Sequence, residues 1–188
     1  IDTAAFLTMH RRAFVFNEPG TGKTLSALWA ADYLMQRGYV RRVLVLCPLS
    51  IMHSAWMNDL NQSILHRSAI IAHHAKAVRR VEMIQGDYEF VITNYEGLNL
   101  IANEVKADGR FDLVIADEAH YLKNATSNRT KIFNDFAMKI PVRWLLTGTP
   151  ITNKPIDFYN LLYLCDSPVA ANWVGYVKRY CAGRQFNR

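Results

Sequence analysis

The sequence predicts an α/β domain in which a mostly parallel sheet has helices on both faces. Short apolar runs alternate along the chain with longer segments whose apolar residues recur at helical spacing, as in strand–helix–strand units. Three of the apolar runs end directly in glycine-rich, acidic or hydroxyl-bearing segments, at Asn17–Thr24, Asp117–His120 and Leu146–Pro150. Since open α/β sheets bind ligands at the carboxyl ends of their strands, these segments predict one ligand site.

The expected elements follow in chain order. Strands are expected at the apolar runs 13–16, 43–47, 89–93, 111–116 and 143–147, with a further strand near 69–72. Helices are expected at 23–37, 50–61, 75–85, 95–106, 128–138 and 155–165. Residues 1–166 are expected to form one domain, and residues 167–188 a partly helical appendage.

The first strand leads into a glycine-rich turn and then a helix, which is the setting of a phosphate-binding P-loop. Glycines let backbone N–H groups curl around an anion, and the helix start adds positive partial charge. Lys23 supplies a cation for the outer phosphates, and the Thr24 hydroxyl can bind magnesium. The residues expected to contact the nucleotide are Pro19, Gly20, Thr21, Gly22, Lys23, Thr24 and Leu25.

Asn17 stands where the usual P-loop pattern has glycine. Asparagine tolerates a positive φ better than most residues, so the loop can still close. A Gly-Lys-Thr triplet alone also fits an ordinary strand–turn–helix connection, and the assignment therefore depends on the two later motifs.

The strand at 111–116 delivers Asp117 and Glu118 to its carboxyl end. We expect Asp117 to hold hydrated magnesium beside Thr24, and Glu118 to polarise the attacking water. Together with Lys23, these two carboxylates are the expected catalytic residues. His120 is close enough in sequence to reach the γ-phosphate region or a partner surface.

The strand that ends near Leu146 is followed by Thr147, Gly148 and Thr149. Their hydroxyls can sense the nucleotide or the neighbouring acidic motif. Alone, this segment also reads as a plain Thr/Gly/Pro turn. With His120, these three residues are the expected coupling residues.

In order and spacing, these motifs resemble those of the first motor lobe of the Swi/Snf-type ATPases, which are double-stranded-DNA translocases of helicase superfamily two. The resemblance covers nearly the whole chain. Asn17–Thr24 is similar to motif I, Val43–Leu60 to motif Ia, Val91–Leu98 to motif Ib, Asp117–Asn124 to motif II, and Leu145–Leu164 to motif III with its following helix. RNA helicases of the DEAD and DEAH groups usually carry Ser-Ala-Thr where this chain has Thr-Gly-Thr-Pro.

The resemblance implies a three-layer RecA-like P-loop NTPase fold, ATP and Mg²⁺ as cofactors, and double-stranded DNA bound through its phosphates. It also implies a second RecA-like lobe with arginine fingers, and a glutamine-containing adenine motif upstream of the P-loop. We expect both to lie outside this chain, which then is one domain of a larger protein.

The implied DNA contacts are Ser50, Thr93, Asn94, Lys123 and Asn124. Ser50 is also expected to cap the helix that follows it, and helix starts bind phosphate without reading bases. Thr93 and Asn94 also fit plain helix capping, and Lys123 and Asn124 can contact DNA or pack against the acidic motif.

The composition agrees with an intracellular protein that works with DNA. The net charge is +6, and basic residues recur as pairs, at 11–12, 41–42, 79–80 and 178–179, which favours a polyanionic partner. Taken alone, the same charges fit solvated surface faces equally well. The sequence contains no run long enough to span a membrane.

Two alternative functions stay open. The chain can be the motor lobe of a restriction-type or strand-separating helicase, or a nucleotide-gated DNA-binding module that does not translocate. The Thr-Gly-Thr-Pro form and the Lys123-Asn124 extension favour the duplex translocase over the strand-separating helicase. A tethered second lobe would distinguish a motor from a binding module.

Overall fold

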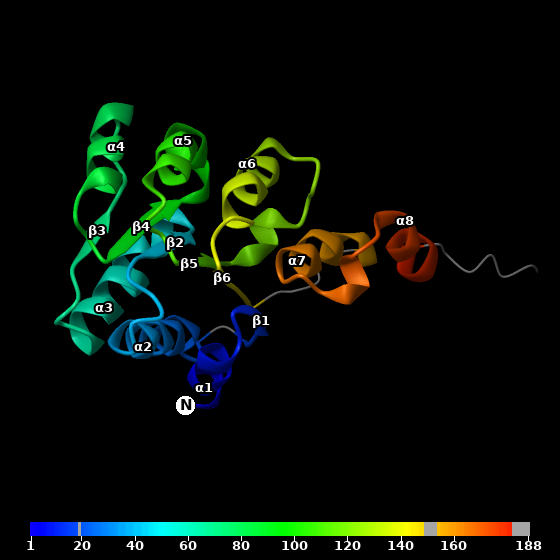
Figure 1. Cartoon of the computed structure of the whole chain (residues 1–188), viewed down its shortest axis with the longest axis horizontal. Helices are drawn as coiled ribbons and strands as arrows, with labels where there is room; N and C mark the ends of the chain where they lie inside the picture. The colour runs from blue at the N-terminus through cyan, green and yellow to red at the C-terminus, as the bar shows by residue number, and fades with distance from the viewer. Residues whose placement is uncertain (19, 149–153, 182–188) are drawn as a thin grey trace, which may run out of the picture.

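A computed structural model describes residues 1–18, 20–148 and 154–181. Its centre is a six-stranded sheet in the order β1-β6-β5-β2-β4-β3, in which every strand pair is parallel (Figure 1). The strands are β1 (Arg12–Phe16), β2 (Val43–Cys47), β3 (Ala69–Ile71), β4 (Phe90–Asn94), β5 (Leu113–Asp117) and β6 (Val142–Thr147). All of the expected strands are therefore confirmed, including the one near 69–72, which forms an edge of the sheet.

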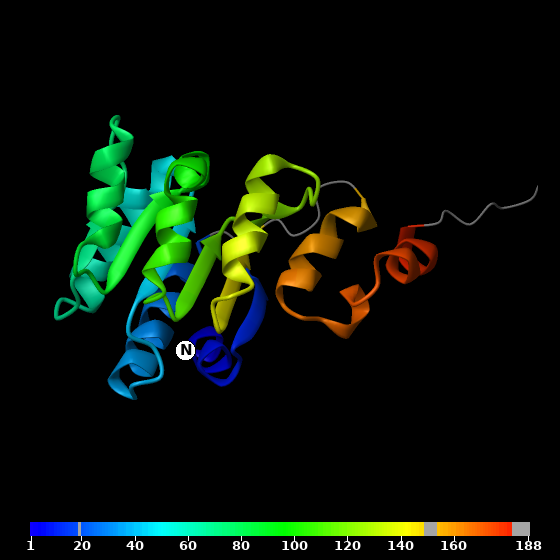
Figure 2. The ribbon, with the colours of Figure 1, turned by 45° about the horizontal axis from the view of Figure 1, so that its top comes forward.

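Helices cover both faces of the sheet, as expected (Figures 1 and 2). One face carries α1 (Asp2–Met9), α2 (Lys23–Gln36) and α3 (Asn58–Ser63), and the other carries α4 (Ala77–Gln85), α5 (Leu98–Asp108) and α6 (Asn128–Ala137). Beyond β1 lie α7 (Tyr159–Leu164) and α8 (Trp173–Tyr176). The three-layer RecA-like fold class is confirmed.

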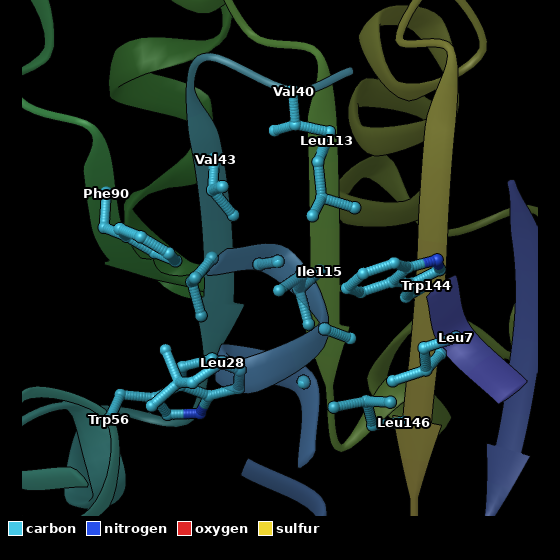
Figure 3. Packing of buried hydrophobic residues seen from close by; sticks show 14 of the residues in the cluster. Leu7, Leu28, Val40, Val43, Trp56, Phe90, Leu113, Ile115, Trp144 and Leu146 are labelled. Atoms are coloured by element: carbon cyan, nitrogen blue, oxygen red, sulfur yellow. The ribbon is translucent and has the colours of Figure 1, made fainter. Parts of the chain in front are cut away.

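The four inner strands are buried along their whole length because both of their faces are covered. Alternate residues of β5 and β6 enter different core layers. Ile115, Trp144 and Leu146 pack with Leu28 and Trp56 in the layer beneath α2 (Figure 3), whereas Val114 and Leu145 pack against α5 and α6. This two-sided burial fixes the register of the strands whose ends form the site.

Several helical segments differ from the expectation, and the helices expected at 95–106 and 155–165 begin as the 3₁₀ turns Tyr95–Gly97 and Pro155–Phe158. The helix α1 is not among the expected helices, because its sequence shows no clear apolar stripe. In the structure, Leu7 is its one fully buried residue. The helix expected at 50–61 is divided into a 3₁₀ turn (Leu49–Ile51), a π-helical turn (Met52–Met57) and α3. The π turn contains one additional residue per turn, which rotates the side chains that follow relative to an α-helix.

Two buried arginines at the amino-terminal edge of the sheet donate hydrogen bonds to the ends of helices. Arg143 of β6 is 1% exposed and donates hydrogen bonds to carbonyl oxygens beyond α6 and at the end of α7. Arg42, just before β2, is 4% exposed and donates to the carbonyls of Ile84 and Gly86 at the end of α4 and to the Asp108 carboxylate. The buried guanidinium of Arg42 therefore has a structural role. The prediction that the basic pair 41–42 favours a polyanionic partner does not hold for Arg42.

The segment expected to be an appendage packs on the helical turns before it. The Tyr176 hydroxyl donates to the carbonyl of Pro155 at 2.6 Å, and the Trp173 ring meets the Tyr159 ring edge-on at 4.5 Å. The boundary at residue 166 remains a prediction. Within the described ranges, no helix is both long and apolar enough to cross a bilayer.

Candidate nucleotide and DNA site

Three adjacent strand ends bring the predicted motifs together. In the sheet, β6 lies between β1 and β5, so that Phe16 pairs with Thr147 and Leu146 pairs with Asp117. The P-loop after β1, the acidic motif after β5 and the Thr-Gly segment after β6 therefore share one edge. The sequence predicts that these segments form one ligand site, and the strand order of the sheet explains how they meet.

The P-loop depends on glycine at two positions. Gly20 and Gly22 have φ values of 78° and 76°, in the left-handed region that residues with a Cβ rarely adopt, and Gly22 immediately precedes α2. Asn17 does not have a positive φ, which corrects the expectation for it. Its side-chain amide instead donates to the Thr3 hydroxyl at 2.9 Å, which ties the start of the loop to α1.

The Lys23 ammonium lies inside the loop. It donates to the carbonyl oxygens of Asn17 at 2.8 Å and Glu18 at 3.0 Å, and the residue is only 9% exposed. Thr21 closes the turn through its hydroxyl, which donates to the Glu18 carbonyl at 2.7 Å. Thr24 and Leu25 are half-buried in the first turn of α2, and Pro19 lies outside the described residues.

Asp117 is the last residue of β5 and is held by three donors. Its Oδ2 accepts from the Trp56 indole N–H at 2.9 Å, its Oδ1 accepts from the Glu118 backbone N–H at 2.9 Å, and its carbonyl oxygen accepts from the Tyr95 hydroxyl at 2.7 Å. Burial raises the pKa of Asp117, and the nearby Glu118 charge adds to the rise, although Trp56, the Glu118 N–H and Lys23 oppose it. A cation beside Asp117 would favour its charged form.

Glu118 adopts a left-handed backbone conformation, with φ 52° and ψ 51°. Such a conformation costs a non-glycine residue about 1 kcal/mol or more and is concentrated at functional sites. It turns the chain sharply after β5. The Glu118 Oε2 then lies 3.3 Å from the Thr147 hydroxyl and 3.2 Å from Nδ1 of His120.

His120 completes a polar cluster between the acidic motif and β6. Its Nδ1 lies 3.4 Å from the Thr147 hydroxyl, so Glu118, His120 and Thr147 meet one another. The predicted contact between the acidic motif and the Thr-Gly segment is therefore present in the structure. Gly148 follows directly and is half-buried, and Thr149 lies outside the described residues.

The predicted DNA contacts divide into exposed and buried residues. Ser50 is exposed but lies within the 3₁₀ turn, which Pro48 precedes, so the prediction that Ser50 caps a helix is wrong. Asn124 is also exposed, and its side chain accepts from the backbone and hydroxyl of Thr126. Lys123 is half-buried, with its ammonium 3.8 Å from the Asp157 carboxylate.

The structure does not support the prediction that the side chains of Thr93 and Asn94 contact phosphates. They end β4, an inner strand, and are 0% and 4% exposed. The Thr93 hydroxyl donates to the Ala72 carbonyl, and the Asn94 amide donates to the Glu96 carboxylate. Neither side chain is presented to solvent, because both faces of the sheet are covered at this point.

Trp56 and Tyr95 were missed as site residues. Both are fully buried aromatic residues of the segments that resemble motifs Ia and Ib, and nothing in their spacing indicates a polar role. The burial of Tyr95, together with the nearby charges of Asp117 and Glu118, raises the pKa of its hydroxyl well above the usual value, so it remains a hydrogen-bond donor.

Comparison with known proteins identifies the family. The model of the SNF2-related domain matches residues 6–181. A chromatin regulator of Caenorhabditis elegans, the homolog of SWI/SNF-related subfamily A-like protein 1, is 28% identical over 93% of this chain. The mouse SWI/SNF-related regulator of chromatin subfamily A member 1 is 33% identical over 78% of it.

A solved structure confirms the fold. The Sulfolobus solfataricus SWI2/SNF2 ATPase core in complex with dsDNA superposes with a TM-score of 0.79 at 21% identity, over 94% of this chain and 37% of that one. The chain spans only 24% and 14% of the lengths of the worm and mouse relatives. Matched over almost its whole length by the family model, the chain belongs to the SNF2-related domain family.

Proposed function

We propose that this chain is the ATP-binding motor lobe of a DNA-dependent ATPase that translocates on double-stranded DNA. One observation carries the proposal: the P-loop, the Asp117-Glu118 pair and Thr147 converge on three adjacent strand ends. The names of its relatives, a chromatin regulator and a SWI2/SNF2 ATPase core in complex with dsDNA, support the same reading. We infer that the protein works inside the cell, on DNA, together with a second RecA-like lobe.

The residues present fit magnesium and ATP. Gly20 and Gly22 have the positive φ that lets backbone N–H groups turn toward an anion, and Lys23 adds a buried positive charge for the outer phosphates. Magnesium is typically held by one or two protein oxygens together with substrate phosphates and waters, and the Thr24 hydroxyl and Asp117 carboxylate are of that kind. When bound, magnesium would neutralise charge on the phosphate oxygens.

Glu118 is the proposed general base. Its carboxylate is oriented by the Thr147 hydroxyl and by His120, and it can accept a proton from a water directed at the terminal phosphate. Because Thr147 lies on β6 and Glu118 after β5, a shift between those strands would change the orientation of the base. We therefore assign His120, Thr147, Gly148 and Thr149 to coupling.

We also propose a place for the adenine base beside the P-loop. A hollow of about 300 Å³ is formed by α1 and the end of β1, with Phe6, Phe16 and Asn17 in its lining. The residues Phe6 and Phe16 are 38% and 47% exposed, which leaves aromatic surface for stacking on a base. We propose that these rings act together with an adenine motif upstream of the P-loop.

Titration with a fluorescent ATP analogue and magnesium tests the nucleotide site. Lys23→Ala removes a charge-assisted contact to phosphate worth about 1.5–3 kcal/mol, so affinity should fall by about 10- to 100-fold. The control is Lys139→Ala, which removes an exposed lysine just after α6. Equal affinities for wild type and Lys23→Ala would show that the P-loop does not bind phosphate.

DNA binding is tested on the same chain with two unrelated duplexes. Contacts from Ser50, Lys123 and Asn124 to phosphates should give weak binding that falls with salt and does not depend on sequence. A marked preference for one duplex, or no salt dependence, would contradict the proposal. A strand-displacement assay on the full-length protein distinguishes the two motor functions. A strand-separating helicase would release one strand of the duplex, whereas a duplex translocase would leave both strands paired.

A further inference from the structure

Two aromatic donors reach Asp117 from the two segments that follow β2 and β4. Trp56 comes from the π-helical turn after β2, and Tyr95 directly follows β4. They bind different atoms of Asp117: the indole N–H donates to the carboxylate at 2.9 Å and the phenol to the carbonyl oxygen at 2.7 Å. Both side chains are at most 1% exposed, so water does not replace either donor easily.

The segment that holds Trp56 continues directly from the exposed Ser50. The 3₁₀ turn Leu49–Ile51 runs into the π turn without a break, and the Ser54 hydroxyl donates to the Ser50 carbonyl at 2.9 Å. Each residue of a helix rotates the next side chain by about 100°, so the extra residue of a π turn sets the direction in which Trp56 points. Single-turn π insertions of this kind are frequent at functional sites.

Tyr95 is connected to the other side of the acidic motif. Its ring stacks on Tyr121 with centroids 5.1 Å apart and planes 2° from parallel. Tyr121 belongs to the 3₁₀ turn Ala119–Leu122, which also carries His120. Asp117 and the turn that follows it are thus held from both sides by aromatic rings.

We propose that Trp56 is a positioning residue that transmits contact at the DNA face around Ser50 to the carboxylate of Asp117. The inference rests on the proposed function, because it presupposes that Ser50 meets DNA and that Asp117 holds magnesium. A shift of the Ser50 turn would move the indole N–H relative to Oδ2 and so turn the carboxylate. Tyr95 holds the carbonyl oxygen of Asp117 in place. A movement of Trp56 would therefore rotate the side chain of Asp117 and not shift its backbone.

The test replaces the indole N–H and keeps the ring. Trp56→Phe removes the donor, and 3-benzothienylalanine at position 56 keeps the shape of tryptophan with sulfur in place of the N–H. Trp29→Phe is the control, because Trp29 is 43% exposed on α2 and takes no part in the site. The full-length protein is compared for nucleotide affinity with and without Mg²⁺, and for ATP hydrolysis with and without duplex DNA.

In both position-56 variants, the increase in nucleotide affinity caused by Mg²⁺ should be about tenfold smaller than in wild type. The stimulation of ATP hydrolysis by duplex DNA should also be much smaller. Their nucleotide affinity without Mg²⁺ and their DNA affinity should stay at the wild-type level, which a general loss of structure would not allow. Unchanged Mg²⁺ dependence and DNA stimulation in the benzothienylalanine protein would overturn the role of Trp56. If wild type itself showed neither effect, the proposed function would fall, and the relay with it.

Discussion

Replacing Arg143 by methionine should destabilise the domain by about 3 kcal/mol. The guanidinium is 1% exposed and makes three short hydrogen bonds, to the carbonyl of Leu164 at 2.8 Å, to that of Ile140 at 3.1 Å and to the Asp166 carboxylate at 3.0 Å. A buried polar group left without a partner costs about 1–3 kcal/mol, so the two carbonyls together account for about 2–6 kcal/mol.

Two corrections bring the estimate to the lower half of that range. The Asp166 side chain is 37% exposed and keeps its 2.7 Å ion pair with Arg12, so its charge stays hydrated and paired. Methionine also fills part of the volume with an apolar side chain and removes the cost of burying a cation. The remainder, about 3 kcal/mol, is a large share of the 5–15 kcal/mol that stabilises a typical domain.

Urea denaturation of the 188-residue chain, followed by circular dichroism and tryptophan fluorescence, measures the effect. The midpoint should fall by about 1–2 M with an unchanged slope. Arg12→Met is the matched control, because Arg12 pairs with the same carboxylate from a 43% exposed position and should cost less than about 1 kcal/mol. A loss below about 1 kcal/mol for Arg143→Met, or an equal loss in both variants, would refute the reasoning.

Three further predictions follow from the fold and the site. Burial raises the pKa of Asp108, but hydrogen bonds from Arg110 and Arg42 outweigh this and leave it below its usual value. Asp108→Asn should therefore lower the free energy of unfolding at pH 6, with a difference from wild type that shrinks as the pH falls below about 4; a difference that is constant with pH would contradict this. Ser127→Ala should cost about 1 kcal/mol in urea, because the Ser127 hydroxyl caps α6 by accepting from the Thr130 N–H, whereas an unchanged midpoint would show that the cap contributes nothing. The 188-residue chain should bind ATP but hydrolyse it at near-background rates, since arginine fingers contribute about 10³–10⁵ in rate and the family resemblance places them in the second lobe; robust DNA-stimulated turnover by this chain would overturn that expectation.

The strands and the meeting of the motifs were predictable because both depend on local pattern. An inner parallel strand must be apolar on both faces, so β2, β4, β5 and β6 appear in the sequence as continuous apolar runs. Glycines, carboxylates and hydroxyls that follow such runs must lie at the carboxyl edge of the sheet. The positions of the P-loop, Asp117 and Thr147 follow from that rule.

The support around the site was not predictable, because it comes from positions far apart in sequence. Trp56 and Asp117 are separated by 61 residues and Arg42 and Asp108 by 66, and a tryptophan or an arginine carries no local sign of its distant partner. Thr93 and Asn94 look like polar residues before a helix, yet tertiary packing turns them inward. Secondary-structure pattern thus locates a site but does not show which side chains point into it.

The pairing of β1 with β6 has a consequence for how the protein is made. The Trp144 indole donates to the carbonyl of His10, 134 residues away, and the strand that carries the P-loop pairs with the strand that ends at Thr147. Contacts of such long range form late, because the loop between them must close first. During synthesis, a chain that has left the ribosome only as far as β5 therefore contains its P-loop sequence without a nucleotide site. If the proposed site binds ATP, we expect ATP to stabilise the domain only after β6 has emerged.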